Sequence, residues 1–225
     1  MPVFNSERFL KNAIESIINQ SYKNIEILII YDYSSDNTYK ILSTFLNNQK
    51  IKLLHGDGSG LVAALNIGLK NATGEFIARM DADDISLPTR FEEQLDYLID
   101  NKIDLCGTSY EMIYKNKIVG RWDGPESDND IKCALLFMSP FAHPSVMFRK
   151  KITNNIRYSK YKYGEDYKFW TDLAIKGLRM GNINKPLLKY RYHSEQLSSS
   201  NIPELRKITS KISRSYLNYV GKKNK

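Results

Sequence analysis

The feature that most limits the fold of this chain is the alternation of short apolar runs with amphipathic segments over residues 1–84. The apolar runs are continuous and rich in β-branched residues, which is typical of buried strands, and they occupy residues 25–30, 51–54 and 74–80. Between them, apolar residues recur at helical spacing, and we expect helices at residues 6–20 (capped by Ser6), 38–47 and 61–71. This alternation predicts an α/β fold with a mostly parallel sheet flanked by helices.

The remaining chain continues in the same style with less regular spacing. We expect one helix from Pro88 to about residue 101 and another over residues 166–176, closed by Gly177. Strand-like pieces lie at residues 103–106, 110–114, 145–148 and 187–192.

A final helix is predicted over residues 203–220, and it has two unlike faces. Its apolar residues fall within about 100° of arc and are Leu205, Ile208, Ile212, Tyr216, Tyr219 and Val220. The opposite side carries Arg206, Lys207, Lys211 and Arg214. Two interpretations stay open: the apolar face packs on the domain, or the helix lies on an anionic membrane surface.

The charge of the chain is unevenly distributed. The net charge is +8, yet residues 1–148 carry 14 basic and 20 acidic side chains, whereas residues 149–225 carry 19 basic and 5 acidic ones. This asymmetry suggests an anionic partner for the C-terminal part. Tyr158, Tyr161 and Tyr163 interleave with basic residues there, but no nucleic-acid-binding motif accompanies them, so we expect no nucleic-acid partner.

Cysteine content and hydropathy indicate where the protein works. The two cysteines, Cys106 and Cys133, form no CxxC pair, which favours a reducing compartment. No apolar run approaches the roughly 20 residues of a membrane-spanning helix, and the start of the chain lacks the pattern of a signal peptide. We therefore expect a cytoplasmic protein, with peripheral contact to the inner face of a membrane through residues 203–225 as an option.

A pair of carboxylates ends the third apolar run, in the DXD sequence Asp81-Ala82-Asp83. Ligands of open α/β sheets bind at the carboxyl ends of strands, and carboxylates are natural ligands of Mg²⁺ or Mn²⁺. A metal held there could neutralise a diphosphate leaving group. The alternative is an acidic turn that caps the helix after Pro88, but the position at a strand end favours the metal site.

Taken in order, these residues resemble family 2 glycosyltransferases. The resemblance covers about residues 1–200 and rests on seven short motifs: Pro2-Val3-Phe4-Asn5-Ser6-Glu7, Tyr31–Thr38, Gly60–Asn66, Arg79-Met80-Asp81-Ala82-Asp83-Asp84, His143-Pro144-Ser145-Val146-Met147, Gly164-Glu165-Asp166 and Tyr190-Arg191-Tyr192-His193. It implies a GT-A fold with a nucleotide-binding half (1–84), an acceptor-side half (85–202) and a basic tail (203–225). The family has an apolar first strand before Pro2, so we expect most of that strand to be absent.

The resemblance also implies roles for donor-side residues. Asp32 would bind the base, usually uracil, and Phe4 would stack near it. Asp81 would lie near the ribose and the metal, and Asp83 would ligate a divalent Mn²⁺ or Mg²⁺. Arg191 and His193 would close over the diphosphate, with His193 as a further metal ligand.

On the acceptor side, the resemblance makes Asp166 the general base. A carboxylate suits that role, and a helix N-terminus favours its anionic form. The alternative is a plain N-cap, which is a common use of Asp. Glu165 could bind the acceptor or support the loop, and His143 could be either structural or part of the site.

The function implied is inverting transfer of a hexosyl or N-acetylhexosaminyl group from a nucleotide sugar, such as a UDP-sugar. The acceptor would be a glycan or a lipid-linked sugar in surface polysaccharide biosynthesis. A sugar nucleotidyltransferase is an alternative, but no glycine-rich triphosphate loop lies near the N-terminus. A non-catalytic module that binds polyanions or membranes through the basic part is the other alternative.

Overall fold

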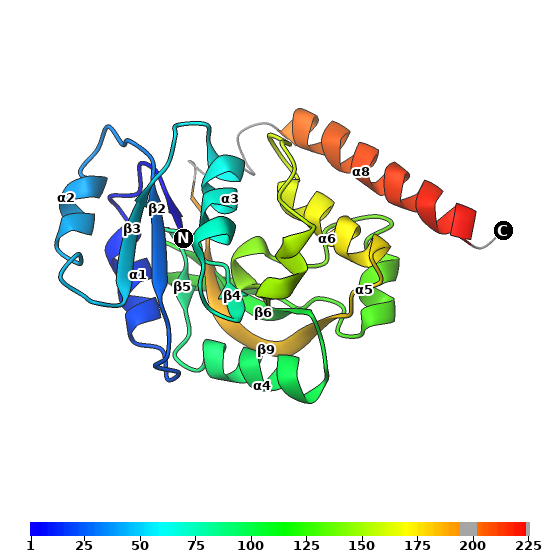
Figure 1. Cartoon of the computed structure of the whole chain (residues 1–225), viewed down its shortest axis with the longest axis horizontal. Coiled ribbons are helices and arrows are strands. Elements are labelled where there is room, and N and C mark those ends of the chain that lie inside the picture. The colour runs from blue at the N-terminus through cyan, green and yellow to red at the C-terminus, as the bar shows by residue number, and fades with distance from the viewer. Residues whose placement is uncertain (194–201, 224–225) are drawn as a thin grey trace.

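The first half of the molecule is built on a small parallel sheet. The computed structural model describes residues 1–193 and 202–223. Strands β1 (Pro2–Val3), β2 (Ile27–Tyr31) and β3 (Ile51–His55) form a sheet in the order β1-β2-β3, with both pairings parallel. Every residue of the central β2 is buried, which explains its unbroken apolar run. Helices α1 (Leu10–Ile18), α2 (Thr38–Ser43) and α3 (Leu61–Asn71) connect and flank these strands (Figure 1).

The start of the chain forms a short strand and differs from expectation at Ser6. Pro2 and Val3 form β1 and pair with the end of β2, and the Met1 amino group donates to the Leu28 carbonyl at 2.9 Å. This short strand lies at the edge of the sheet, whereas β2 is central. The capping role of Ser6 is wrong, because α1 begins at Leu10 and the Ser6 hydroxyl donates to the Phe4 carbonyl instead.

The second half is organised by a mixed, curled sheet of six strands. Its order is β4-β8-β6-β9-β5, and β7 pairs with β6. The strands are β4 (Phe76–Ala78), β5 (Ile85–Ser86), β6 (Leu105–Tyr114), β7 (Lys117–Trp122), β8 (Met147–Arg149) and β9 (Met180–Arg191). We expected residues 74–80 to extend the parallel sheet, but β4 pairs antiparallel with β8. An apolar run shows that a strand is buried without showing which neighbour it pairs with, so this pairing could not be read from the sequence.

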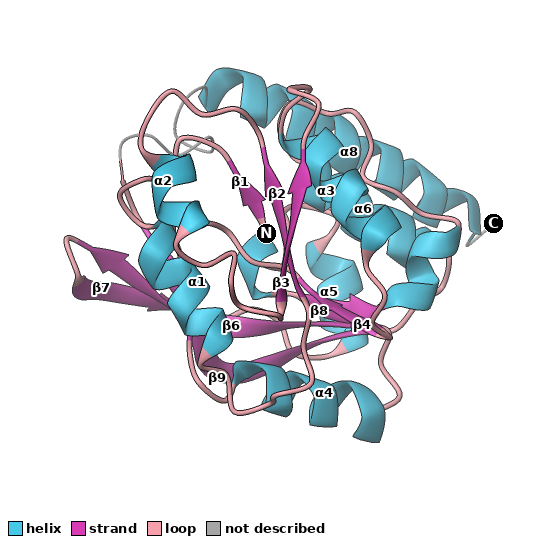
Figure 2. Cartoon of the chain, turned by 60° about the vertical axis from the view of Figure 1, so that its left-hand side comes forward, coloured by secondary structure: helices cyan, strands magenta, loops and turns pink. Residues whose placement is uncertain are grey.

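Helices cover this second sheet. They are α4 (Arg90–Asp100), α5 (Asp128–Ala134), α6 (Glu165–Ile175) and α8 (Ile202–Lys223), with short 3₁₀ turns at η1 (His143–Ser145) and η2 (Lys150–Asn154). Figure 2 shows α4 below the sheet, with α6 and α8 side by side above it. Gly177 ends α6 with a φ of +75°, which favours glycine.

The two sheets and the helices that flank them confirm the α/β fold class predicted from the sequence.

The terminal helix α8 packs on the domain, so the first interpretation of its apolar face is correct. Ile212 and Tyr216 are 2% and 4% exposed and belong to the core cluster that contains Trp170. The Ser213 hydroxyl donates to the Leu136 carbonyl, and the Tyr219 hydroxyl donates to the Ile175 carbonyl at 3.1 Å. Among the described residues, none of the helices has both the length and the hydropathy needed to cross a membrane.

We predict that the packing of α8 contributes measurably to stability. Ile212→Ala should lower the free energy of unfolding by about 2–4 kcal/mol, because it leaves a cavity in the core. Leu217→Ala on the same helix is the matched control: Leu217 is 53% exposed, and its loss should change little. Urea titration of both variants measures the difference, and equal effects would contradict the packing described.

Candidate active site

Three carboxylates cluster just after β4. Ligand atoms of Asp81, Asp83 and Asp84 all lie within 4.8 Å of one another. Oδ1 of Asp84 accepts from the Arg191 backbone N–H at 2.8 Å, whereas its buried Oδ2 has no hydrogen-bond partner within the described part of the chain. Burial and the charges of Asp83 and Asp81 raise the pKa of Asp84 well above its ordinary value. This concentrated negative charge and the unsatisfied oxygen fit a divalent cation.

The backbone that carries this cluster is held by a buried arginine of α4. Arg90 donates from one terminal nitrogen to the carbonyls of Arg79 at 2.9 Å and Val146 at 3.3 Å, and from Nε to Gln94 at 2.9 Å. Its side chain is fully buried, and this burial lowers its pKa to about 9. Arg90 therefore ties the ends of β4 and β8 to α4, which places the acidic turn.

A buried ion pair joins Arg79 to Asp81. The Arg79 side chain is 6% exposed, and one of its terminal nitrogens contacts Oδ2 of Asp81. Burial acts to lower the pKa of Arg79, but the Asp81 carboxylate has a larger combined effect in the opposite direction. The pKa of Arg79 is therefore raised. The positive charge of Arg79 also acts to lower the pKa of Glu165 and Asp166. The acidic cluster and the start of α6 therefore belong to one electrostatic site.

Asp166 lies in the first turn of α6 but does not cap it. The cap position belongs to Gly164, with a φ of +70°, so the N-cap interpretation of Asp166 is wrong. Oδ2 of Asp166 accepts a hydrogen bond from the Ser139 hydroxyl at 3.4 Å. Burial and the neighbouring charge of Glu165 raise the pKa of Asp166, against the opposing effects of His143 and Arg79. A raised pKa makes this carboxylate a stronger proton acceptor.

His143 is a buried neighbour of Glu165. Its Nδ1 lies 3.6 Å from Oε1 of Glu165, and its Nε2 lies 2.9 Å from the Tyr158 hydroxyl. Asn66 of α3 holds the backbone of Tyr158 with two hydrogen bonds of 2.9 and 3.1 Å. Burial lowers the pKa of His143 to about 3, so the ring is neutral near pH 7. His143 is close enough to Glu165 to orient that side chain.

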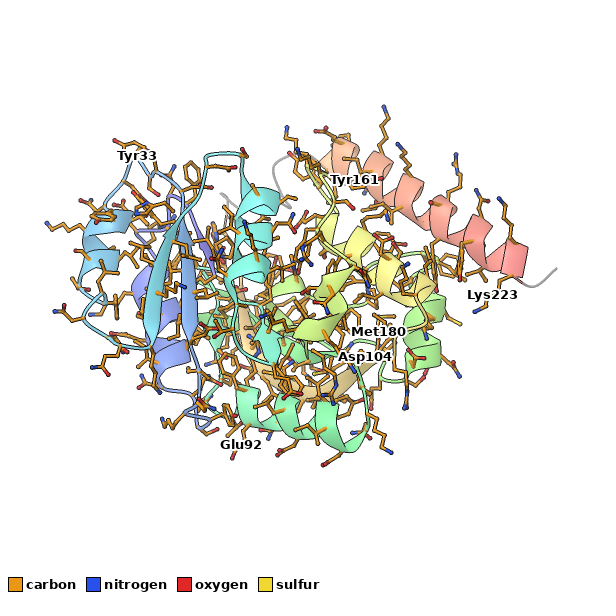
Figure 3. The ribbon with its side chains drawn as sticks, in the orientation of Figure 1. Tyr33, Glu92, Asp104, Tyr161, Met180 and Lys223 are labelled. Atoms are coloured by element: carbon orange, nitrogen blue, oxygen red, sulfur yellow. The ribbon has the colours of Figure 1, made fainter. Side chains whose placement is uncertain are left out.

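The residues expected to bind the base lie at the carboxyl edge of the parallel sheet. Asp32 follows β2, and its Oδ1 accepts from the Gly58 backbone N–H at 3.2 Å. A Cβ at Gly56 would lie only 1.9 Å from that same oxygen, so a larger residue there would displace the Asp32 carboxylate. Phe4 follows β1 with 61% of its surface exposed, which leaves its ring free to stack. Figure 3 shows Tyr33, beside Asp32, on the same upper edge of the molecule as Tyr161 before α6.

The end of β9 brings Arg191 and His193 to the acidic cluster. His193 Nε2 lies 2.8 Å from Oδ2 of Asp83. Arg191 is 3% exposed; it donates from Nε to the Asp83 carbonyl at 2.8 Å and from a terminal nitrogen to Asn116 at 3.0 Å. Its guanidinium lies 4.4 Å from the centre of the Phe9 ring. Arg191 thus braces the acidic turn, and its contact with a diphosphate stays a prediction.

Sequence reasoning left Arg79, Asp84, Asn116 and Phe9 without a role. Arg79 and Asp84 flank the DXD sequence and begin and end the six-residue motif Arg79–Asp84, so their positions were a usable signal. Asn116 has a φ of +62° in the turn between β6 and β7 and reaches Arg191 only through the fold. No local pattern could have indicated that contact.

Comparison with known proteins identifies the chain. The structure of S. aureus TarS in complex with UDP-GlcNAc is similar, with a TM-score of 0.75 and 18% identity over 97% of this chain and 70% of that one. This similarity defines the class of fold as GT-A. The sequence profile described as "Glycosyl transferase family 2" matches residues 1–166, so the chain belongs to that family.

Two curated relatives agree with this assignment. An uncharacterized glycosyltransferase of Haemophilus influenzae is 35% identical over 97% of this chain and 73% of its own length. The Escherichia coli protein UDP-Glc:alpha-D-GlcNAc-diphosphoundecaprenol beta-1,3-glucosyltransferase WfgD is 32% identical over 92% of this chain and 81% of its own length. The chain is a glycosyltransferase, and the alternatives of a nucleotidyltransferase and a non-catalytic module are wrong.

We predict opposite effects on stability for two neighbouring carboxylates when metal is removed with a chelator. Asp81→Asn should cost about 3–5 kcal/mol, because it leaves Arg79 buried without its partner. Asp84→Asn keeps the acceptor for the Arg191 N–H but removes one buried charge, so it should raise the free energy of unfolding. Urea titrations at pH 7 measure both; a loss of equal size in both variants would contradict the charge arrangement.

We also predict that His143 makes the protein acid-sensitive. Its pKa is lower in the folded than in the unfolded state, so below pH ~6.5 only the unfolded chain gains the proton. Stability should fall by up to ~1.4 kcal/mol per pH unit from this residue, down to pH of about 3. His143→Gln should remove that slope, whereas His55→Gln, at an exposed position, should keep it. Unfolding at pH 7, 6 and 5 tests the difference.

Proposed function

We propose that this glycosyltransferase moves a hexosyl or N-acetylhexosaminyl group from a UDP-sugar to a hydroxyl of a glycan or lipid-linked acceptor, with inversion at the anomeric carbon. The observation that carries the proposal is the Arg79-centred site, which joins an acidic cluster to a carboxylate of raised pKa. The UDP-GlcNAc of the TarS complex and the donor in the name of WfgD support the choice of nucleotide. A second Escherichia coli relative, the O-antigen biosynthesis glycosyltransferase WbnJ, is 31% identical over 89% of this chain and supports a role in surface polysaccharide assembly.

On the donor side, the base would lie against Phe4 and donate a hydrogen bond to the Asp32 carboxylate. Asp81, Asp83 and Asp84 would hold Mn²⁺ or Mg²⁺, which when bound offsets the charge of the leaving diphosphate. His193 could join them as a ligand if its Nε2 is released from Asp83. Arg191 would brace the turn and add positive charge on the diphosphate side.

On the acceptor side, Asp166 would take the proton of the attacking hydroxyl. The hydroxyl oxygen then forms a bond to the anomeric carbon, and the bond from that carbon to the diphosphate oxygen breaks on the opposite face. The electron pair of the broken bond leaves with UDP, and the proton stays on Asp166. Glu165, held near His143, would bind the acceptor or keep Asp166 oriented.

We divide the chain into a donor half (1–84), an acceptor half (85–202) and a basic helix (203–225). We place the protein in the cytoplasm, where UDP-sugars are available to it. The exposed basic side of α8 could contact the anionic inner surface of a membrane. The buried apolar side of α8 does not take part in such contact.

We predict that Asp166→Asn lowers sugar transfer or donor hydrolysis by about 10²–10⁴-fold while UDP-sugar binding is kept, because the base is lost but the donor side is intact. Asp172→Asn, on the same helix and paired with Lys168, is the matched control and should retain activity. A panel of UDP-sugars with Mn²⁺ or Mg²⁺, assayed for released UDP, measures turnover, and calorimetry measures binding.

The same assay tests the metal site. Chelation should stop UDP release, and Asp83→Ala should abolish it even with added metal. Full activity of the wild type in chelator would overturn the metal assignment, and unchanged turnover by Asp166→Asn would overturn the assignment of the base.

A further inference from the structure

A groove of about 350 Å³ lies between α8 and the loop that follows α5. Its walls include Leu136 and Phe137 of the loop and Ser213, Arg214 and Leu217 of the helix. The hydrogen bond from the Ser213 hydroxyl to the Leu136 carbonyl fastens the loop to the helix at the base of the groove. The groove is therefore a formed feature of the packed α8.

The rim of this groove is unusually apolar for an exposed surface. Phe137 and Leu217, which line the groove, are 82% and 53% exposed, and Met138, next to Phe137 in the chain, is 50% exposed. Clustered exposed apolar side chains indicate a binding surface, whereas isolated ones need no explanation. Arg214 lines the groove, and Arg206 lies about two turns earlier on the same helix. The surface thus combines an apolar strip with fixed positive charge.

The groove adjoins the acceptor side of the site. The loop that presents Phe137 and Met138 continues directly to Ser139, whose hydroxyl donates to Asp166 at 3.4 Å. On the other wall, Thr209 of α8 packs beside Gly164, where an added Cβ would lie 3.6 Å from the Thr209 methyl carbon. A molecule whose reacting hydroxyl sits at Asp166 could extend along this groove without crossing the donor side.

We propose that this groove binds the prenyl diphosphate portion of a lipid-linked acceptor: the first isoprene units on Phe137, Met138 and Leu217, and the diphosphate at Arg214. The proposal rests on the proposed function, and it adds a site for the acceptor. A membrane surface would be attracted equally by all exposed basic residues of α8, whereas the concave shape and the position beside Asp166 favour a single acceptor molecule. The acceptor in the name of WfgD has this chemistry.

Equilibrium dialysis of the full chain with radiolabelled farnesyl diphosphate tests the proposal. Arg214→Glu should weaken binding by about tenfold, because it removes a charged contact to phosphate. Phe137→Ser should weaken it by about fivefold through lost apolar contact. Lys211→Glu makes a comparable charge change at a position of α8 that does not line the groove, and it should weaken binding by less than about twofold. Farnesol and inorganic pyrophosphate should each bind far more weakly than the diphosphate lipid.

Three results would overturn the proposal: no binding of farnesyl diphosphate, equal losses in Arg214→Glu and Lys211→Glu, or equal affinity for farnesol. Equal losses would indicate general attraction to a basic helix, as for anionic vesicles of phosphatidylglycerol. UDP release by the same preparations separates this proposal from the proposed function, because a wrong groove leaves donor hydrolysis intact. Unchanged urea midpoints show that the variants fold.

Discussion

The site is organised around one buried guanidinium, that of Arg79. Arg79 is almost fully buried, and burying a cation costs several kcal/mol unless a carboxylate accompanies it. Asp81 supplies that carboxylate, and this pairing fixes the direction in which the acidic turn leaves β4. The same charge acts on Glu165 and Asp166, so the side chain that pairs with Asp81 also contributes to the electrostatics at the start of α6.

The acidic turn carries an excess of negative charge that neighbouring basic groups of the chain do not fully neutralise. Three carboxylates face one another, and Arg79 pairs with Asp81. The Arg191 backbone N–H and the Arg90 contacts to neighbouring carbonyls fix the backbone but do not neutralise the other two carboxylates. Repulsion of this kind disfavours the folded state until a cation arrives. Offsetting the charge of these carboxylates should therefore stabilise the turn.

Features coded within a few residues were predictable. The helix at residues 61–71 was expected at the observed bounds of α3, because its apolar spacing and the preceding glycine are local signals. The DXD turn was placed at a strand end for the same reason. Pairing of β4 with β8, and of β6 with β9 in parallel, joins segments about 70 residues apart, and the sequence holds no local record of either partner.

The sequence by itself determined the fold class, the family resemblance and the identity of the acidic residues, since periodicity and short motifs depend on neighbouring positions. Tertiary structure decided what those residues can do. In the fold, Gly164 rather than Asp166 is the cap of α6, and His143 is buried next to Glu165. Arg191 hydrogen-bonds to the backbone of the acidic turn and holds it in place. The physical reason is that burial, pKa and partner choice depend on distances between segments remote in the chain, and only folding sets those distances.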